Sequence, residues 1–364
     1  MNDIVTPFLF IDEEILDRNI RSAADFCRGR GLRLRPHVKT HNVAVIAKKQ
    51  IKAGSSGVTV ATLREAKAMA FSGIRDIFIA RQIADEAELS GLAGLMSGAD
   101  VSLAMDSADA AAMASIKMRE KGLTLKVVIE IDSGAHRCGL ESTEGILDLA
   151  EKIRGFDGLE FYGIFTHEGH VYSAKSRESM SEIVRDVIVK MTHIADALKQ
   201  RGFPPSVVSI GSTPTLRYAE DFLGVNEVRP GNYVFNDAMQ VANGTAGIED
   251  CGLKAVATVI SKPAEDRAVL NIGSKSLGSD RGANVSDPGG FGLVVDPERH
   301  ATTRIYEEHS VIQEKNSLKI GQRVVMIPGH SCVAANLAPE IFVVSKGKIT
   351  GSWKNTRYAS GQAG

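Results

Sequence analysis

The sequence predicts an α/β fold: a (β/α)8 TIM-type barrel over residues 1–243 and a C-terminal all-β domain over residues 244–364, with which the first residues are expected to pair. Short apolar runs alternate with longer amphipathic segments through the first two-thirds of the chain, as in parallel strands joined by crossover helices. Polar and glycine-rich segments directly follow several of these runs, where the active site of a barrel is built. After Asn243 the helical spacing nearly disappears, which indicates a change of domain.

The barrel begins with clear strand and helix signals. Residues 8–11 are strand-like, and residues 14–28 have the apolar spacing of a helix that two glycines end. Thr62 is a good N-cap for a helix over residues 63–71. Further strands are predicted at residues 32–38, 58–60, 77–80, 101–104, 125–131, 159–166, 207–210 and 227–229, with a helix at residues 42–53. Strand–helix alternation of this length favours a closed barrel, and a doubly wound open sheet is the alternative because periodicity alone does not show closure.

Strand signals dominate residues 244–364. They lie at residues 255–260, 268–272, 323–327, 341–344 and 349–353, and Lys346-Gly347-Lys348 has the composition of a hairpin turn. The 364 residues also exceed the ~250–300 that one hydrophobic core usually holds, which agrees with two domains.

Composition and charge exclude several classes of protein. The chain has 43 Lys and Arg against 44 Asp and Glu, so it shows no electrostatic footprint for nucleic acid or an anionic membrane. No run approaches the ~20 apolar residues of a membrane helix, and the N-terminus lacks a signal-peptide pattern. The 4 cysteines, Cys27, Cys138, Cys251 and Cys332, lie far apart and form no CxxC pair. We therefore expect a cytoplasmic protein in a reducing setting.

Lys39 is the first candidate for chemistry. It follows a predicted strand and is flanked by Arg35, His37 and His41. Nearby cations disfavour the ammonium form, so the pKa of Lys39 is expected to be lowered. A lysine with a lowered pKa is what Schiff-base chemistry needs, although a solvated basic turn would give the same pattern.

Two further polar segments follow strands. Arg137 lies between two glycines, which would let the backbone approach a ligand closely; a glycine-rich loop with a solvent-exposed arginine is the alternative. His167 and His170 flank Glu168 at the end of another strand. They could bind a metal, stack on a ring or transfer protons, or they could be ordinary core histidines.

Small and hydroxyl-bearing residues mark a candidate phosphate site. Gly211, Ser212 and Thr213 precede a helical segment, where N–H groups and hydroxyls can bind a phosphate; a turn with an N-cap is the alternative. Another strand ends in Arg229-Pro230-Gly231-Asn232-Tyr233, which adds a cation, a glycine that allows close approach, and a phenol.

The second domain contributes a candidate metal pair. His330 and Cys332 are spaced i, i+2, and imidazole and thiolate both suit zinc. Two protein ligands are too few for a structural zinc but would leave positions for water and substrate, as a catalytic metal requires. A buried cysteine beside a surface histidine is the alternative.

Together these segments resemble the fold-type III pyridoxal phosphate (PLP) enzymes, the alanine racemase-like barrels, and more closely the D-threonine aldolase/D-serine dehydratase family. The likeness runs from Thr6-Pro7 to Trp353. The segment Arg35-Pro36-His37-Val38-Lys39-Thr40 resembles the PLP-lysine motif of that family, and the four other barrel segments match in the same order.

The resemblance implies a role for each barrel residue. Lys39 would hold PLP and later move protons, and His167 would lie against the pyridine ring. Arg137 would sit near the phenolic oxygen of the cofactor. Arg229 would face the pyridine nitrogen, keep it unprotonated and so weaken the electron sink. The phosphate would be held, partly through backbone N–H groups, by Gly211, Ser212, Thr213, Gly231 and Tyr233.

The resemblance also implies a divalent metal at His330 and Cys332. Several aldolases of the family have an aspartate at the second position, and the dehydratases have cysteine. The cysteine favours zinc, with manganese as the alternative. Glu308-His309 resembles a segment that lies near the metal, although Ser310 replaces a glycine there.

The implied function is a lyase that acts on D-3-hydroxy amino acids. Retro-aldol cleavage to glycine and an aldehyde is our first expectation, because residues 232–237 and Asn336-Leu337 are closer to the aldolase branch. Dehydration to ammonia and a keto acid is the alternative, which Cys332 favours. An amino-acid racemase would use a tyrosine base where this chain has its metal pair, and a non-catalytic PLP-binding protein would resemble the barrel alone.

The resemblance further implies a homodimer in which the β domain of one subunit closes the barrel mouth of the other. The substrate side chain beyond Cβ stays open. Arg281 is a candidate cation for a second substrate carboxylate.

Overall fold

The computed structural model describes residues 3–358, and eight of its strands form one parallel sheet that curls into a barrel. In sheet order they are β2 (Arg33–Leu34), β9 (Glu227–Val228), β8 (Val207–Ile210), β7 (Leu159–Thr166), β6 (Leu125–Ile131), β5 (Asp100–Met105), β4 (Asp76–Ile79) and β3 (Val58–Val60). A parallel bridge between His37 and Thr59 joins the two ends of this order. The predicted (β/α)8 barrel is therefore confirmed, in preference to an open doubly wound sheet.

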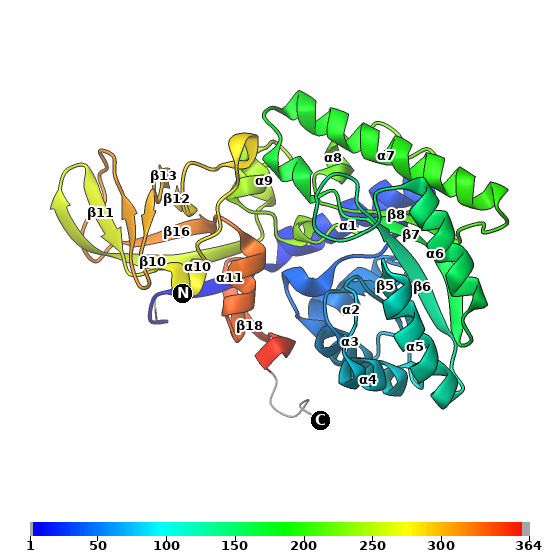
Figure 1. The fold of residues 1–364 in the computed structure, drawn as a ribbon. Helices are drawn as coiled ribbons and strands as arrows, with labels where there is room; N and C mark the ends of the chain where they lie inside the picture. The colour runs from blue at the N-terminus through cyan, green and yellow to red at the C-terminus, as the bar shows by residue number, and fades with distance from the viewer. Residues whose placement is uncertain (1–2, 359–364) are drawn as a thin grey trace.

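Helices surround the barrel strands (Figure 1). They are α1 (Glu13–Gly29), α2 (Ala44–Lys52), α3 (Leu63–Phe71), α4 (Glu86–Met96), α5 (Ala108–Lys121), α6 (Thr143–Gly155), α7 (Arg177–Gln200) and α8 (Thr215–Tyr218). Helix α9 (Ala238–Ala242) instead packs against the β domain (Figure 1), where the Met239 N–H donates to the Gly329 carbonyl. The caps follow the sequence: Thr62 accepts from the Glu65 N–H, and α5 ends where Gly122 takes a left-handed φ of +64°. No helix among residues 3–358 combines the length and the apolar character needed to cross a bilayer.

One predicted barrel strand is much shorter in the structure. Residues 32–38 form only the two-residue strand β2, followed by a 3-10 turn at Val38–Thr40. Ladder hydrogen bonds continue to His37, whose N–H donates to the Pro230 carbonyl at 3.0 Å, and the backbone turns directly after it. The turn places Lys39 at the barrel mouth.

The second sheet recruits the N-terminus of the chain. Strand β1 (Phe8–Asp12) pairs antiparallel with β10 (Leu253–Ala264) and parallel with β17 (Glu340–Ser345), so it does not belong to the barrel. The other strands are β11 (Arg267–Leu270), β12 (Gly292–Asp296), β13 (His300–Ala301), β14 (Arg304–Ile305), β15 (Ser310–Ile312), β16 (Arg323–Pro328) and β18 (Lys348–Lys354). The predicted β-rich C-terminal domain is confirmed, with two short helices, α10 (Ser274–Leu277) and α11 (Ser331–Leu337).

Helix α11 lies between the β domain and the barrel (Figure 1). Asn336, in its last turn, donates to the carbonyl of Lys39 at 2.7 Å. The last described segment packs here too, because the N–H of Thr356 donates to the carbonyl of Asn42 at 2.7 Å. Both contacts bring residues from the end of the chain against the lysine turn.

Candidate active site

A cavity of about 780 Å³ lies between the barrel mouth and α11. Nine of the eleven predicted site residues line it: Lys39, His167, Gly211, Ser212, Thr213, Arg229, Gly231, His330 and Cys332. An adjoining cavity of about 310 Å³ shares Lys39, His167, Gly211 and Arg229 with the first and adds Arg137. Tyr233 is the exception, because its phenol points away from the cavity and accepts from the Gln50 amide at 3.0 Å.

Lys39 is half-buried in the cavity wall, and desolvation is the largest cause that lowers the pKa of its amine. The thiol of Cys332 opposes this shift, while the guanidinium groups of Arg137 and Arg229 add to it. The direction agrees with the sequence expectation. A neutral amine is a nucleophile and a base, so the environment of Lys39 suits both Schiff-base formation and proton transfer.

The cause of that shift differs from the one expected. Arg35 turns away from Lys39 and forms ion pairs with Glu227 at 2.9 Å and Asp76 at 2.6 Å. His41 is fully buried, and burial lowers its pKa to about 3, so it is neutral. Burial also lowers the pKa of His37 well below its usual value. None of the three flanking cations therefore acts on Lys39 as predicted, and desolvation takes their place.

His167 follows β7 and faces Lys39 from the opposite wall. Its Nδ1 donates to the carbonyl of Gly211 at 3.0 Å, which leaves Nε2 as an acceptor. Burial lowers its pKa to about 4, and the charge on Lys39 adds to this shift. His170 instead packs against Gly134 and does not line the cavity. The two histidines therefore do not converge on one metal.

The loops after β8 and β9 form a cradle for an anion. Among the described residues, the N–H groups of Ser212, Thr213 and Gly231 have no acceptor. A Cβ on Gly211 would lie 2.7 Å from the backbone nitrogen of Arg229, and one on Gly231 would lie 2.7 Å from the Thr40 hydroxyl. Only glycines allow this approach, and open N–H groups are what a phosphate requires.

Two predicted phosphate donors are already engaged. The N–H of Gly211 donates to the buried carboxylate of Glu168 at 3.1 Å. The N–H of Tyr233 donates to the hydroxyl of Thr213 at 3.0 Å. These two residues therefore shape the cradle and hold its loops together.

Arg229 is buried at the junction of the two cavities. It donates to the Ser209 hydroxyl at 2.6 Å and to the Thr166 carbonyl at 2.6 Å, and it lies 4.9 Å from the Phe165 ring centroid. Its Nε has no partner among the described residues. A buried donor without an acceptor is costly, so this atom is suited to a ligand acceptor.

His330 and Cys332 face the lysine turn of the same chain. The Cys332 sulfur lies 3.4 Å from the Thr40 hydroxyl, and His330 Nδ1 lies 3.1 Å from Asp280 Oδ2. Burial alone would lower the pKa of His330, but Cys332 together with Asp237 and Asp280 raises it to about 10. The surroundings therefore stabilise positive charge where a metal would bind.

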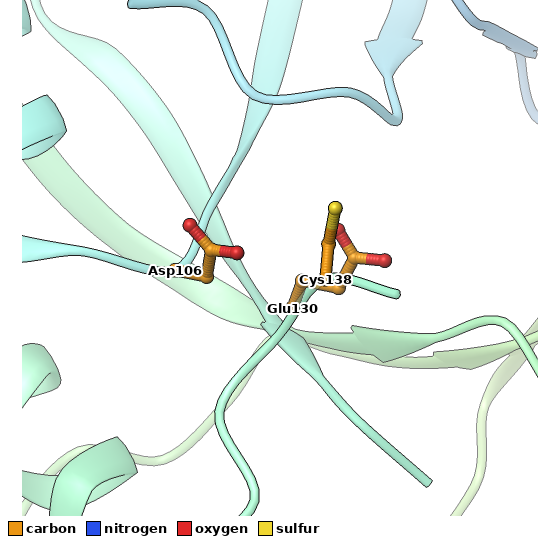
Figure 2. Close-up of side chains that lie close together, drawn as sticks. All are labelled: Asp106, Glu130 and Cys138. Atoms are coloured by element: carbon orange, nitrogen blue, oxygen red, sulfur yellow. The ribbon is translucent and has the colours of Figure 1, made fainter. Parts of the chain in front are cut away.

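Another set of metal-type side chains lies elsewhere. Figure 2 shows Asp106, Glu130 and Cys138 converging near the ends of β5 and β6. Their carboxylates are engaged: Asp106 accepts from the Gly139 N–H at 3.0 Å, and Glu130 accepts from Arg137 at 3.4 Å. Hydrogen bonds within the protein therefore account for this cluster without an ion.

Several residues of the site were not singled out from the sequence. Asp237 is fully buried and accepts from the Ser331 N–H at 2.9 Å, between the two residues of the metal pair. Tyr172 lines the cavity, and burial raises its pKa, so it stays a donor. Glu308-His309, expected near the metal, is exposed and outside the cavity lining.

Comparisons with known proteins identify the families that the two domains match. Residues 11–238 match the family described as the alanine racemase N-terminal domain, and residues 252–344 match a putative serine dehydratase domain. The chain is 32% identical to D-threo-3-hydroxyaspartate dehydratase from Delftia sp. strain HT23, over 96% of each chain. It is 29% identical to D-threonine aldolase from Arthrobacter sp., over 96% of this chain and 91% of the relative.

The solved structure of the Delftia dehydratase is also similar. It superposes with a TM-score of 0.90 at 30% identity, covering 97% of this chain and 98% of that one. The same enzyme has been solved as a histidine-to-alanine variant and as a cysteine-to-alanine variant in a metal-free form.

Proposed function

This chain belongs to the alanine racemase-like, fold-type III family of PLP enzymes that carry a serine dehydratase domain, and we propose that it is a metal-assisted lyase of D-3-hydroxy amino acids. The observation that carries the proposal is one cavity lined by Lys39, by an anion cradle and by the pair His330 and Cys332. The dehydratase and aldolase relatives named above act on amino acids of this class by their names.

The cavity fits PLP. Lys39 would hold the cofactor, and the open N–H groups of Ser212, Thr213 and Gly231 would receive its phosphate. The unpartnered Nε of Arg229 would meet the pyridine nitrogen. Bound PLP supplies an electron sink for negative charge at the substrate Cα.

The residues around the ring have separate tasks. The amine of Lys39, whose pKa burial lowers, would take the Cα proton. His167 is fixed by Gly211 in one tautomer and would lie against the ring face as a neutral group. Arg137 lies at the edge of the smaller cavity, where it would meet the phenolic oxygen.

A divalent metal fits His330 and Cys332, and the thiolate favours zinc over manganese. Support comes from the two Delftia variants, because the substituted histidine and cysteine are two positions apart, as they are here. A metal at this pair would bind the β-hydroxyl of the substrate.

Either the Cα–Cβ bond or the Cβ–O bond of the substrate would then break. Loss of the hydroxyl proton leads to retro-aldol cleavage, the outcome that the aldolase-like segments favour. Alternatively, Lys39 would take the Cα proton and pass it to the departing hydroxyl group, which would leave as water. The donor set supports this second candidate, because D-threo-3-hydroxyaspartate dehydratase also carries a histidine and a cysteine at this spacing.

We also propose a homodimer. Since the chain's own β domain already places the metal pair at its own barrel mouth, the partner would cover the outer rim of the cavity. Light scattering on the purified protein tests this, and a monomer at working concentrations would contradict it.

A lysine variant and the opposite stereoisomer of the substrate test the proposed function. Lys39→Ala should lose the visible absorbance of protein-bound PLP and all turnover of D-threonine, while L-threonine should be inert with every variant. Turnover by Lys39→Ala, or an equal rate on the L-isomer, would refute the proposed function.

A further inference from the structure

Among residues 3–358, no hydrogen bond or ion pair engages the guanidinium of Arg357, which lines the larger cavity. Four residues with cationic side chains other than histidine line that cavity: Lys39, Arg229, Arg281 and Arg357. Lys39 is assigned to the cofactor, and Arg229 donates to Ser209 and Thr166. The guanidinium of Arg357 has no hydrogen-bond or ion-pair partner within residues 3–358.

Arg281, the cation first considered for a second substrate carboxylate, is already engaged. It binds both carboxylate oxygens of Asp287, at 3.0 and 2.7 Å, and lies 5.6 Å from the Phe291 ring centroid. Moving it to a substrate would break a two-point ion pair. This leaves Arg357 as the better candidate.

The backbone around Arg357 is held on three sides. The N–H and hydroxyl of Thr356 donate to the Asn42 carbonyl at 2.7 and 2.8 Å. The phenol of Tyr358 donates to the Asn336 carbonyl at 2.8 Å, and the N–H of Arg357 donates to Asn355 at 2.9 Å. The backbone at Arg357 is thereby held between the lysine turn and the helix that carries Cys332, while its side chain is exposed and lines the cavity.

This position is the one that a substituent on Cβ would reach. Lys39, His330 and Cys332 line the same cavity as Arg357. A substrate held at Cα beside Lys39, with its β-hydroxyl toward the metal pair, would therefore have its remaining Cβ group in the cavity that Arg357 lines. The acids that share the lining are engaged: Glu65 accepts from the Ala61 N–H at 2.6 Å, and Asp280 contacts His330.

We propose that Arg357 selects substrates with a second carboxylate on Cβ, so that the preferred substrate class is the 3-hydroxyaspartates. This inference rests on the proposed lyase function. A planar guanidinium matches a carboxylate at two points, and a site built to bind that group discriminates against a methyl in its place.

The test compares two substrates in four proteins: wild type, Arg357→Gln, Arg357→Lys and the control Arg304→Gln, which removes an exposed arginine of β14 outside the cavity. For D-threo-3-hydroxyaspartate, kcat/KM should fall about 10- to 100-fold in Arg357→Gln and less in Arg357→Lys. For D-threonine it should change less than about threefold, and the control should leave the ratio unchanged.

An equal loss on both substrates would assign Arg357 to the α-carboxylate and overturn the proposal, as would an unchanged ratio. A second measurement separates this outcome from failure of the proposed function. Binding of D-aspartate and D-alanine to the PLP-loaded protein, followed by the cofactor spectrum, needs no turnover. A wild type that prefers D-aspartate, and an Arg357→Gln variant that does not, would support the role of Arg357 even if no lyase product formed.

Discussion

Asp237 links the cofactor cradle to the metal pair, and its removal should affect both stability and metal affinity. The carboxylate is fully buried. One oxygen accepts from the Gln240 N–H at 3.0 Å, and the other accepts from the Ser331 N–H at 2.9 Å and from the Asn232 amide. Ser331 stands between the two metal residues, and Asn232 directly follows Gly231.

Asp237→Asn keeps the shape but replaces one acceptor oxygen with a donor. Whichever way the amide is oriented, a backbone N–H then faces an NH₂ group and loses its partner. One lost bond to a charged acceptor costs about 1.5–3 kcal/mol, and the remaining bonds weaken with the charge. We expect the free energy of unfolding to fall by about 2–4 kcal/mol, and zinc affinity to fall about 10-fold or more because Ser331 shifts.

Urea unfolding followed by circular dichroism, and zinc titration of the folded protein, measure the two effects. Asp266→Asn, an exposed carboxylate in the β10–β11 turn, is the matched control. Unfolding within about 0.5 kcal/mol of wild type, together with unchanged zinc affinity, would refute the linking role of Asp237.

Three further changes test the cradle, the core and the metal. Gly211→Ala should lower PLP affinity at least about 10-fold, because its Cβ meets the Arg229 backbone at 2.7 Å; spectral titration measures this. The pKa of His41 is about 3 in the folded protein and 6.5 in the unfolded chain. The contribution of neutral His41 to the free energy of unfolding is therefore complete above pH 6.5 and is lost as the pH falls toward 3, by at most about 5 kcal/mol. Unfolding of His41→Gln should therefore depend less on pH. Cys332→Ala, or chelation, should abolish turnover while bound PLP keeps its absorbance.

Each of these three predictions has a result that would contradict it. Normal PLP binding by Gly211→Ala would show that the loop can move away from Arg229. An unchanged pH profile in His41→Gln would mean that the unfolded chain does not gain a proton there. Full activity in Cys332→Ala without metal would remove the metal from the mechanism.

The barrel and most of the cavity lining could be predicted because both depend on local patterns. Apolar runs alternate with amphipathic helices, and parallel strands bring their carboxyl ends to one mouth. Residues that directly follow strands, such as Lys39 and His167, therefore gather at this mouth. The lengths of the helices between them do not change this. The match of Arg229 to a known segment added a residue that periodicity alone would not select.

Contacts between distant segments could not be predicted from the sequence. Asp237 meets Ser331, and Asn42 meets Thr356, across 94 and 314 positions. The sequence does predict that the first strand pairs with the second domain, but not that its partners there are β10 and β17. The effect of flanking charges on Lys39 was also predicted wrongly. Arg35 lies four residues before Lys39 in the sequence, but its side chain forms an ion pair with Glu227 instead.

The most direct measurement is a product analysis of one reaction. The purified protein, supplied with PLP and zinc or manganese, is incubated with D-threonine, D-serine and D-threo-3-hydroxyaspartate, and glycine, aldehyde, ammonia and keto acid are quantified. We expect one matched pair: glycine with an equal amount of aldehyde for retro-aldol cleavage, or ammonia with an equal amount of keto acid for dehydration. Formation of neither pair from any of the three substrates would contradict the assignment of this cavity as a D-3-hydroxy amino acid lyase site.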